Sequence, residues 1–345
     1  MKHRLLYLPL GEAVDAGIGF TVAFEKLVQS GEIEALKAVQ FCREVKDRGG
    51  WDCMLEHVMK TAIDFRPTAI MWQLQTTGEV PAAFVRQLRS LPAQPVIIQF
   101  TGDSYRRPPR NMVRFGREID ATVLHGTTHV PGFERAGCHD VRFLTHWFHT
   151  EQWCKPWSRT NAPEFDVVMI VNNYRQLPFK RYEGQSDRVE LAKAFGRRYG
   201  ARFAIYGNGW EGHPCAHGFI PNARQPEVMH NAWLILAANN WHHAHYFSDR
   251  LPISLASRVP VLHKWFEGAD DYFQDGRHLW WFRDTAEALS KADAILSLRE
   301  EERNRIAQAG ADEAFRNHSC DRHARRFLQM FDELYERRHS QLQAG

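Results

Sequence analysis

The chain has 345 residues, of which 44% are hydrophobic, and its formal net charge is +3. This length exceeds one core of ordinary size and favours two domains, while the modest charge permits a polyanionic partner without requiring one. No apolar run approaches the roughly 20 residues of a membrane span, and the N-terminal stretch reaches proline and glycine before a signal-peptide core develops. We therefore expect a cytoplasmic protein.

Short apolar runs typical of strands alternate along the chain with segments of helical spacing. Strands are expected at 4–8, 36–41, 68–73, 95–100, 121–125, 141–145, 166–171, 202–206, 234–238 and 259–263. Helices are expected at 20–28, 51–63, 81–91, 131–136, 186–199, 226–232, 250–256, 285–296, 300–314 and 320–338.

This alternation predicts an α/β protein with two parallel-sheet, Rossmann-like domains. We expect an N-terminal acceptor-binding domain at 1–146, a linker at 147–163, a nucleotide-sugar-binding domain at 164–318, and a C-terminal helix at 319–345 that packs back on the first domain. Parallel sheets bind ligands at the carboxyl ends of their strands, so function is expected in the loops that face a central cleft.

The loop after the fourth expected strand contains Asp103 on a glycine-containing turn. A carboxylate at the end of a rigid strand can act as a general base toward an acceptor hydroxyl. A turn or helix-capping aspartate is the alternative. Arginines follow it on a proline-stiffened loop, which suits phosphate or DNA contacts or a solvated surface: Arg106, Arg107, Arg110, Arg114 and Arg117.

In the second domain, a helix is expected to begin near residue 186, with its positive end toward the cleft. Arg175 lies just beyond the preceding strand and Arg188 in the first helical turn, where both could bind a diphosphate leaving group without a metal. Glycines at strand ends suggest tight loops near a ligand: Gly17, Gly19 and Gly207.

Neither the cysteines nor the histidines predict a metal site. The six cysteines form no CxxC pair. His242, His243 and His245 have no evident carboxylate to complete a ligand set, so a polar loop beside a nucleotide explains them equally well. We expect no required cofactor besides the donor substrate, although a divalent metal stays possible.

The segment YFSDRLPISLASRVPVL, with a glycine- and phenylalanine-containing turn after it, resembles the donor half of GT-B glycosyltransferases. The resemblance is closest to the CgeB-like group and the phage DNA β-glucosyltransferases, and it extends over most of the chain. It implies that Asp103 in FTGD is the catalytic base and that Phe219 and Ile220 lie beside the donor's base. Arg250, Arg175 and Arg188 would contact the diphosphate.

The sequence departs from this family pattern at two positions. The family has a glutamate three residues after the arginine, which binds the ribose hydroxyls, and this chain has Ile253. Asp249 or Ser254 could substitute, or the nucleotide is held differently, so UDP is inferred from the resemblance alone. Arg258 stands where relatives often have glycine, which could crowd the donor pocket.

The resemblance implies a glycosyltransferase that uses a nucleotide-diphosphate sugar, with inversion. The acceptor would be a hydroxylated or hydroxymethylated pyrimidine of double-stranded phage DNA, in the host cytoplasm. The alternatives are a CgeB-like enzyme acting on a cell-surface glycan, spore-coat component or small molecule, and a nucleotide or nucleic-acid binder without catalysis. The sugar and the oligomeric state do not follow from the sequence.

Overall fold

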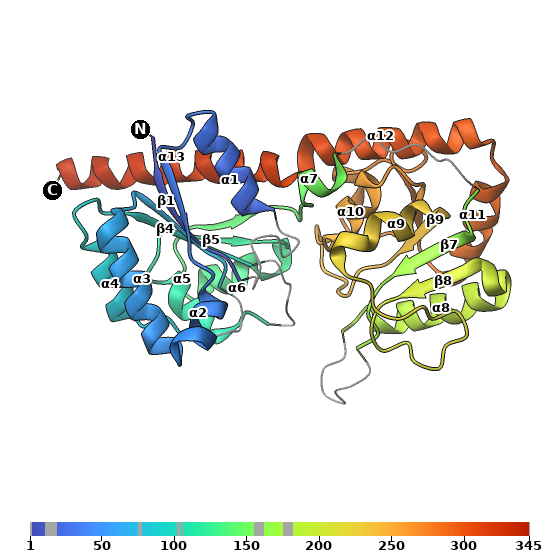
Figure 1. The fold of residues 1–345 in the computed structure, drawn as a ribbon, viewed down its shortest axis with the longest axis horizontal. Helices are drawn as coiled ribbons and strands as arrows, with labels where there is room; N and C mark the ends of the chain where they lie inside the picture. Colours follow the sequence, from blue (N-terminus) through green and yellow to red (C-terminus); the bar gives the residue numbers. More distant parts are fainter. Residues whose placement is uncertain are drawn as a thin grey trace. The chain divides into compact units, whose positions relative to one another are not determined.

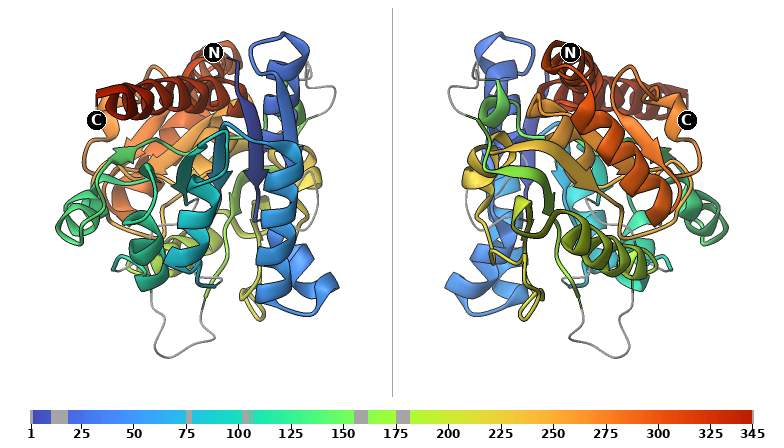
Figure 2. Two further views of the ribbon diagram at one scale, coloured as in Figure 1. Left: turned by 90° about the vertical axis from the view of Figure 1, so that its left-hand side faces the viewer. Right: turned by 90° about the vertical axis from the view of Figure 1, so that its right-hand side faces the viewer.

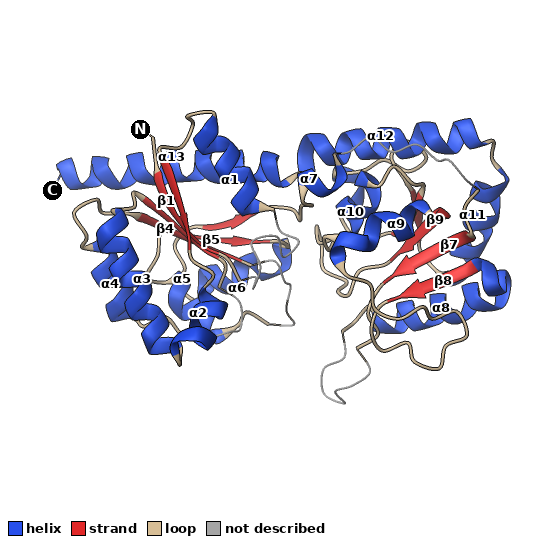
Figure 3. Cartoon of the chain, viewed as in Figure 1, coloured by secondary structure: helices blue, strands red, loops and turns tan. Residues whose placement is uncertain are grey.

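The computed structural model describes residues 2–10, 19–74, 78–101, 105, 107–154, 162–174 and 182–344. It separates into two compact units, one formed by 1–145 together with 320–345 and the other by 146–319. Figure 3 shows that each unit has strands packed among helices. The predicted α/β class with two parallel sheets is confirmed.

The first unit has six parallel strands in the order β2-β1-β3-β4-β5-β6 (Figure 1). Its elements are β1 (Arg4–Leu8), α1 (Phe20–Gln29), β2 (Ala35–Ala38), α2 (Phe41–Arg48), α3 (Trp51–Phe65), β3 (Ala69–Trp72), α4 (Ala82–Arg89), β4 (Val96–Phe100), α5 (Arg110–Gly116), β5 (Ala121–Leu124), α6 (Val130–Arg135), β6 (Val141–Phe143) and α13 (Cys320–Ala344).

Alternating strand side chains bury both faces of this sheet, as the two-residue period of a strand requires. Leu6 and Leu8 face the core that is covered by α3 and α4. On the other face, the ring of Tyr7 contacts those of Phe20 and Phe24 in α1. Helix α13, red in Figure 2, packs on α1, and the rings of Phe327 and Phe20 meet edge-on.

The second unit has five parallel strands in the order β11-β10-β9-β7-β8. Its elements are α7 (Thr150–Trp153), β7 (Phe165–Ile170), α8 (Gln185–Tyr199), β8 (Phe203–Tyr206), α9 (Gln225–His230), β9 (Ala232–Ala237), α10 (Arg250–Ala256), β10 (Val261–Lys264), β11 (Trp280–Phe282), α11 (Thr285–Ser297) and α12 (Glu300–His318). Helices α8 and α11 cover one face, and α10 and α12 contribute to the core on the other.

Several elements differ from the sequence expectation. Residues 110–116 form helix α5 rather than a loop, because Met112 and Phe115 supply a buried apolar face at helical spacing and Pro109 precedes the first turn. The helix α2 and the three-residue strand β11 were not expected. Within the expected linker, α7 forms one turn, and the side chain of Trp153 is buried in the core of the second unit.

Candidate functional site

The strand order of the second sheet reverses between β7 and β9, because β8 pairs with the outer side of β7. Open parallel sheets bind ligands at the carboxyl side of such a switch point. Asn239, just after β9, donates from its amide to the carbonyl of Tyr246 (3.0 Å) and accepts from the N–H of Ser248 (3.2 Å). This residue therefore holds the loop after β9 in a fixed conformation.

Helix α8 begins against this same loop. The N–H of Gly184 donates to the carbonyl of Asn240 (2.8 Å), and a Cβ at Gly184 would lie 2.2 Å from the carbonyl oxygen of Asn239. Only glycine allows this approach, which brings the positive end of a 15-residue helix to the switch point.

Arg188 lies in the first turns of α8 and is buried, with 1% of its surface exposed. Its guanidinium donates to the carbonyl of Ala238 through Nε (3.2 Å) and Nη2 (2.8 Å) and to that of Asn172 through Nη1 (3.4 Å). Burial, followed by the charge of Arg250, lowers the pKa of Arg188 to about 9. A buried cation that is hydrogen-bonded to carbonyls thus joins the ends of β7 and β9.

Arg250 opens α10 and approaches the same strand end from another side. Its Nε donates to the carbonyl of Ile170, the last residue of β7, at 3.1 Å, and its Nη1 lies 3.6 Å from Oδ1 of Asp249. The side chain is 29% exposed, so a ligand can reach it. Two guanidinium groups therefore converge on the end of β7, an arrangement that attracts an anion.

His146 adds no charge to this pair of cations. Its ring is buried and meets the ring of Tyr246 edge-on at 5.9 Å. Burial and the nearby charge of Arg250 lower the pKa of His146 to about 3. The imidazole is therefore neutral at physiological pH, and the positive field at this place comes from the arginines.

The glycines after β8 allow a close approach to the loop after β7. Gly207 and Gly209 both have positive φ, at 135° and 82°. A Cβ would lie 2.2 Å from the carbonyl oxygen of Val171 at the first position and 1.9 Å from that of Asn173 at the second. Gly207 was predicted to lie beside the ligand, and the structure gives both glycines a role in backbone packing.

We expect Gly209→Ala to lower the free energy of unfolding by roughly 3 kcal/mol, since it combines left-handed strain with an overlap that the backbone must relieve. Gly212→Ala is the matched control: Gly212 has φ of 86°, and no atom outside its neighbours lies within 4 Å of the added Cβ. The control should cost only about 1 kcal/mol. Equal losses for both variants in urea denaturation would contradict the steric argument.

The structure places the remaining predicted donor residues in different surroundings. Phe219 is 65% exposed, whereas Ile220 is buried in the core of the unit. Asp249 is half-exposed beside Arg250, and Ser254 is buried in α10. Of these, Phe219 and Asp249 present side chains that a nucleotide could reach.

The two side chains that depart from the family pattern, Ile253 and Arg258, make contacts within the second unit. Ile253 packs against the apolar core, which explains why an isoleucine is tolerated in α10. Arg258 has a positive φ of 60°, donates to the carbonyl of Trp153 (3.1 Å) and lies over the ring of Phe315. Its side chain therefore stabilises the unit's own packing.

A cluster of charged side chains that was not predicted from the sequence lies at the start of α8. The carboxylate of Asp187, in the first helical turn, is 2.5 Å from Nζ of Lys264 and 2.7 Å from Nε2 of His242. These residues come from α8, the end of β10 and the loop after β9. Their sequence separation explains why no motif revealed them.

The other two histidines of that loop point to separate partners. His243 is buried and stacks on Trp241, with ring centroids 5.2 Å apart. His245 has a positive φ and its Nδ1 lies 3.2 Å from the hydroxyl of Tyr272. Within the described ranges, histidine, cysteine and acidic side chains form no group of three that could hold a metal ion.

Four predicted site residues lie outside the described residues: Gly17, Asp103, Arg106 and Arg175. Gly19 is described and has φ of 74° just before α1. At the carboxyl ends of β4 and β5, the first unit has a small pocket of about 10 Å³, lined by Thr101, Tyr105 and His125 among others. The buried ring of His125 places Nδ1 2.5 Å from the carbonyl oxygen of Leu144, and this histidine was not predicted from the sequence.

The arginines after β4 do not form one continuous loop, contrary to the expectation. Arg110 and Arg114 lie on α5, and Arg107 precedes it. Arg107 and Arg110 are exposed, whereas Arg114 is in an ion pair with Glu79 at 2.6 Å. Part of the positive charge of this segment is therefore compensated.

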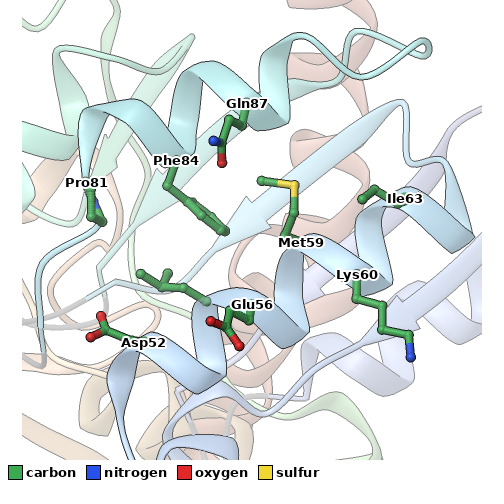
Figure 4. Close-up of a pocket in the computed structure, with 9 residues that line it drawn as sticks. Asp52, Glu56, Met59, Lys60, Ile63, Pro81, Phe84 and Gln87 are labelled. Carbon is green, nitrogen blue, oxygen red and sulfur yellow. The ribbon is translucent and has the colours of Figure 1, made fainter.

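A larger hollow of about 460 Å³ lies between α3 and α4 on the helical surface of the first unit. Figure 4 shows Phe84 and Met59 beside it, with Asp52 and Glu56 along one edge. Its lining residues lie on helices and at the start of α4, not at the strand ends, so we do not assign the donor site to it.

Part of the chain is similar in sequence to a known protein family. Residues 185–329, which include Arg188 and Arg250, match the model of a family described as glycosyl transferase-like. This part, which is less than half of the chain, is therefore similar to glycosyltransferase domains. No curated protein matches the sequence significantly. Among the described residues, no helix has the length and apolar character needed to cross a bilayer.

Solved structures show the same fold over almost the whole chain. A glycosyltransferase from Rickettsia africae is 11% identical, with a TM-score of 0.64 over 96% of this chain and 98% of that one. Anabaena HepE, solved with UDP and glucose, is 12% identical, with a TM-score of 0.60 over 96% of this chain and all of that one. OtsA is 10% identical, with a TM-score of 0.62 over 95% and 99% of the two chains. These likenesses confirm the predicted GT-B fold.

Proposed function

We propose that this protein transfers a sugar from a UDP-sugar to an acceptor hydroxyl. The convergence of Arg188 and Arg250 on the end of β7 carries the proposal, because a departing nucleoside diphosphate requires fixed positive charge at that place. The similar fold of HepE, solved with UDP and glucose, supports UDP as the carrier. No described group of side chains calls for a metal, and the arginines and the start of α8 would stabilise the leaving group.

Asp103 is the proposed general base. It follows β4 in the sequence, and the pocket at the ends of β4 and β5 lies at the same edge of the first sheet. The carboxylate would take the proton of the acceptor hydroxyl while that oxygen attacks the anomeric carbon and the diphosphate leaves. This single in-line displacement inverts the configuration at that carbon.

Two acceptor classes follow from different observations. The exposed Arg107 and Arg110, which follow β4 in the sequence, favour a hydroxymethylated pyrimidine in duplex DNA, which would have to be flipped out of the helix. The ion pair of Arg114 with Glu79 and the small net charge favour a glycan or small-molecule hydroxyl. The comparisons supply no support for DNA.

The test is incubation with UDP-sugars and three acceptor pools: hydroxymethylcytosine duplex, plain duplex and a panel of glycans and small alcohols. Mass spectrometry of nucleosides and of free products detects transfer. Transfer to the hydroxymethylated duplex that weakens steeply with salt supports the DNA acceptor. Transfer only to the panel supports the second class, and UDP binding without donor hydrolysis or transfer contradicts the proposed activity.

A further inference from the structure

Arg188 is too deeply buried to present its guanidinium to a ligand, although it shares the end of β7 with Arg250. Its hydrogen bonds go to the main-chain carbonyls of Ala238, the residue after β9, and Asn172, the second residue after β7. In contrast, Arg250 is partly exposed and is anchored on the carbonyl of Ile170. A ligand at the end of β7 could therefore contact the guanidinium of Arg250 but not that of Arg188.

The charge of Arg188 is poorly compensated within the protein. Burial and Arg250 lower the pKa of Arg188, whereas Tyr174, Tyr246 and Asp249 raise it to a smaller extent, and Asp249 is the carboxylate among these described residues. Asp249 itself is half-exposed and lies 3.6 Å from Nη1 of Arg250. A buried cation in a medium of low polarity acts over a longer range than an exposed one and is costly unless an opposite charge arrives.

We propose that Arg188 is a positioning residue for the donor's diphosphate. Arg188 fixes the ends of β7 and β9 and supplies buried positive charge behind Arg250, without touching the phosphates. This inference rests on the proposed function. The cost of the uncompensated charge is relieved when the diphosphate binds, so Arg188 contributes selectively to the phosphate part of the donor. A residue that only held the fold would affect nucleoside and nucleotide binding alike.

The experiment is calorimetric titration of UDP and of uridine into the full chain and its variants. We expect Arg188→Met to lower UDP affinity about tenfold and to leave uridine affinity unchanged. Arg188→Lys keeps the charge and should keep the ratio of UDP to uridine affinity within about threefold. Arg188→Gln keeps a donor for the Ala238 carbonyl but loses the charge, and should behave like the methionine variant if the latter does not fold.

Arg303→Met is the matched control. Arg303 is also a buried arginine, donates to the carbonyl of Leu296 (2.9 Å) and lies over the ring of Trp233, at the amino end of β9. Its loss should change neither affinity. Equal losses of UDP and uridine binding in the Arg188 variants, or unchanged UDP binding in both uncharged ones, would overturn the inference. If the unaltered protein does not prefer UDP to uridine, the proposed function fails independently of Arg188.

Discussion

Arg250→Met is expected to lower the affinity for UDP roughly a hundredfold, which corresponds to about 3 kcal/mol for a charged hydrogen-bonded contact. Arg250 is the described guanidinium that is both anchored at the end of β7 and open to a ligand, with 29% of its side chain exposed. Arg250→Lys should recover only part of the affinity, because lysine lacks the Nε–H that is bonded to Ile170. Titration calorimetry with UDP measures both effects.

Arg224→Met serves as the control for this prediction. Arg224 belongs to the same unit but is exposed, and its ion pair is with Glu227 at 3.0 Å, three positions along the chain. Removing it should leave UDP affinity within error and unfolding little changed. If Arg250→Met binds UDP as tightly as the Arg224 variant, the assignment of the diphosphate site is wrong.

Asp103→Asn is expected to reduce turnover by about 10² to 10⁴, the range that a positioned general base contributes. The amide has nearly the same shape but cannot accept the acceptor's proton, so UDP affinity should be unchanged. Steady-state kinetics with the acceptor identified in the transfer screen would measure kcat and KM separately.

The control for Asp103 is Asp52→Asn, an exposed aspartate on α3 beside the hollow of the first unit. It should retain full turnover. Near-normal turnover by a folded Asp103→Asn protein would remove this residue from the mechanism and direct attention to other groups at that sheet edge, beginning with His125.

The fold was largely readable from the sequence because parallel strands are buried on both faces. The run 234–238 is apolar throughout and 95–100 is apolar except for Gln99, so each predicted a strand that the structure contains with shifts of one or two residues at its ends. Two short elements were not predicted from the sequence. The helix α2 has one buried residue, Phe41, and β11 has three residues, so neither provides enough periods for a pattern to emerge.

The site was readable only in part. Arg188 was predicted from its place in the first turn of an expected helix and Arg250 from the family resemblance, but their different burial could not be inferred from one-dimensional spacing. Gly184 escaped notice because its constraint is the carbonyl of Asn239, far away in the sequence. The ion pairs of Asp187 with Lys264 and His242 join three separate elements for the same reason.

By itself, the sequence determined the order of strands and helices and therefore the α/β class, because hydrophobic periodicity is a local property of the chain. Only the tertiary structure decided which guanidinium is exposed at the end of β7 and which is buried beneath it. That distinction depends on which loops bury each side chain, and the position of those loops is determined by contacts between residues that are distant in the chain. The electrostatic roles of Arg188 and Arg250 follow from this difference in solvation.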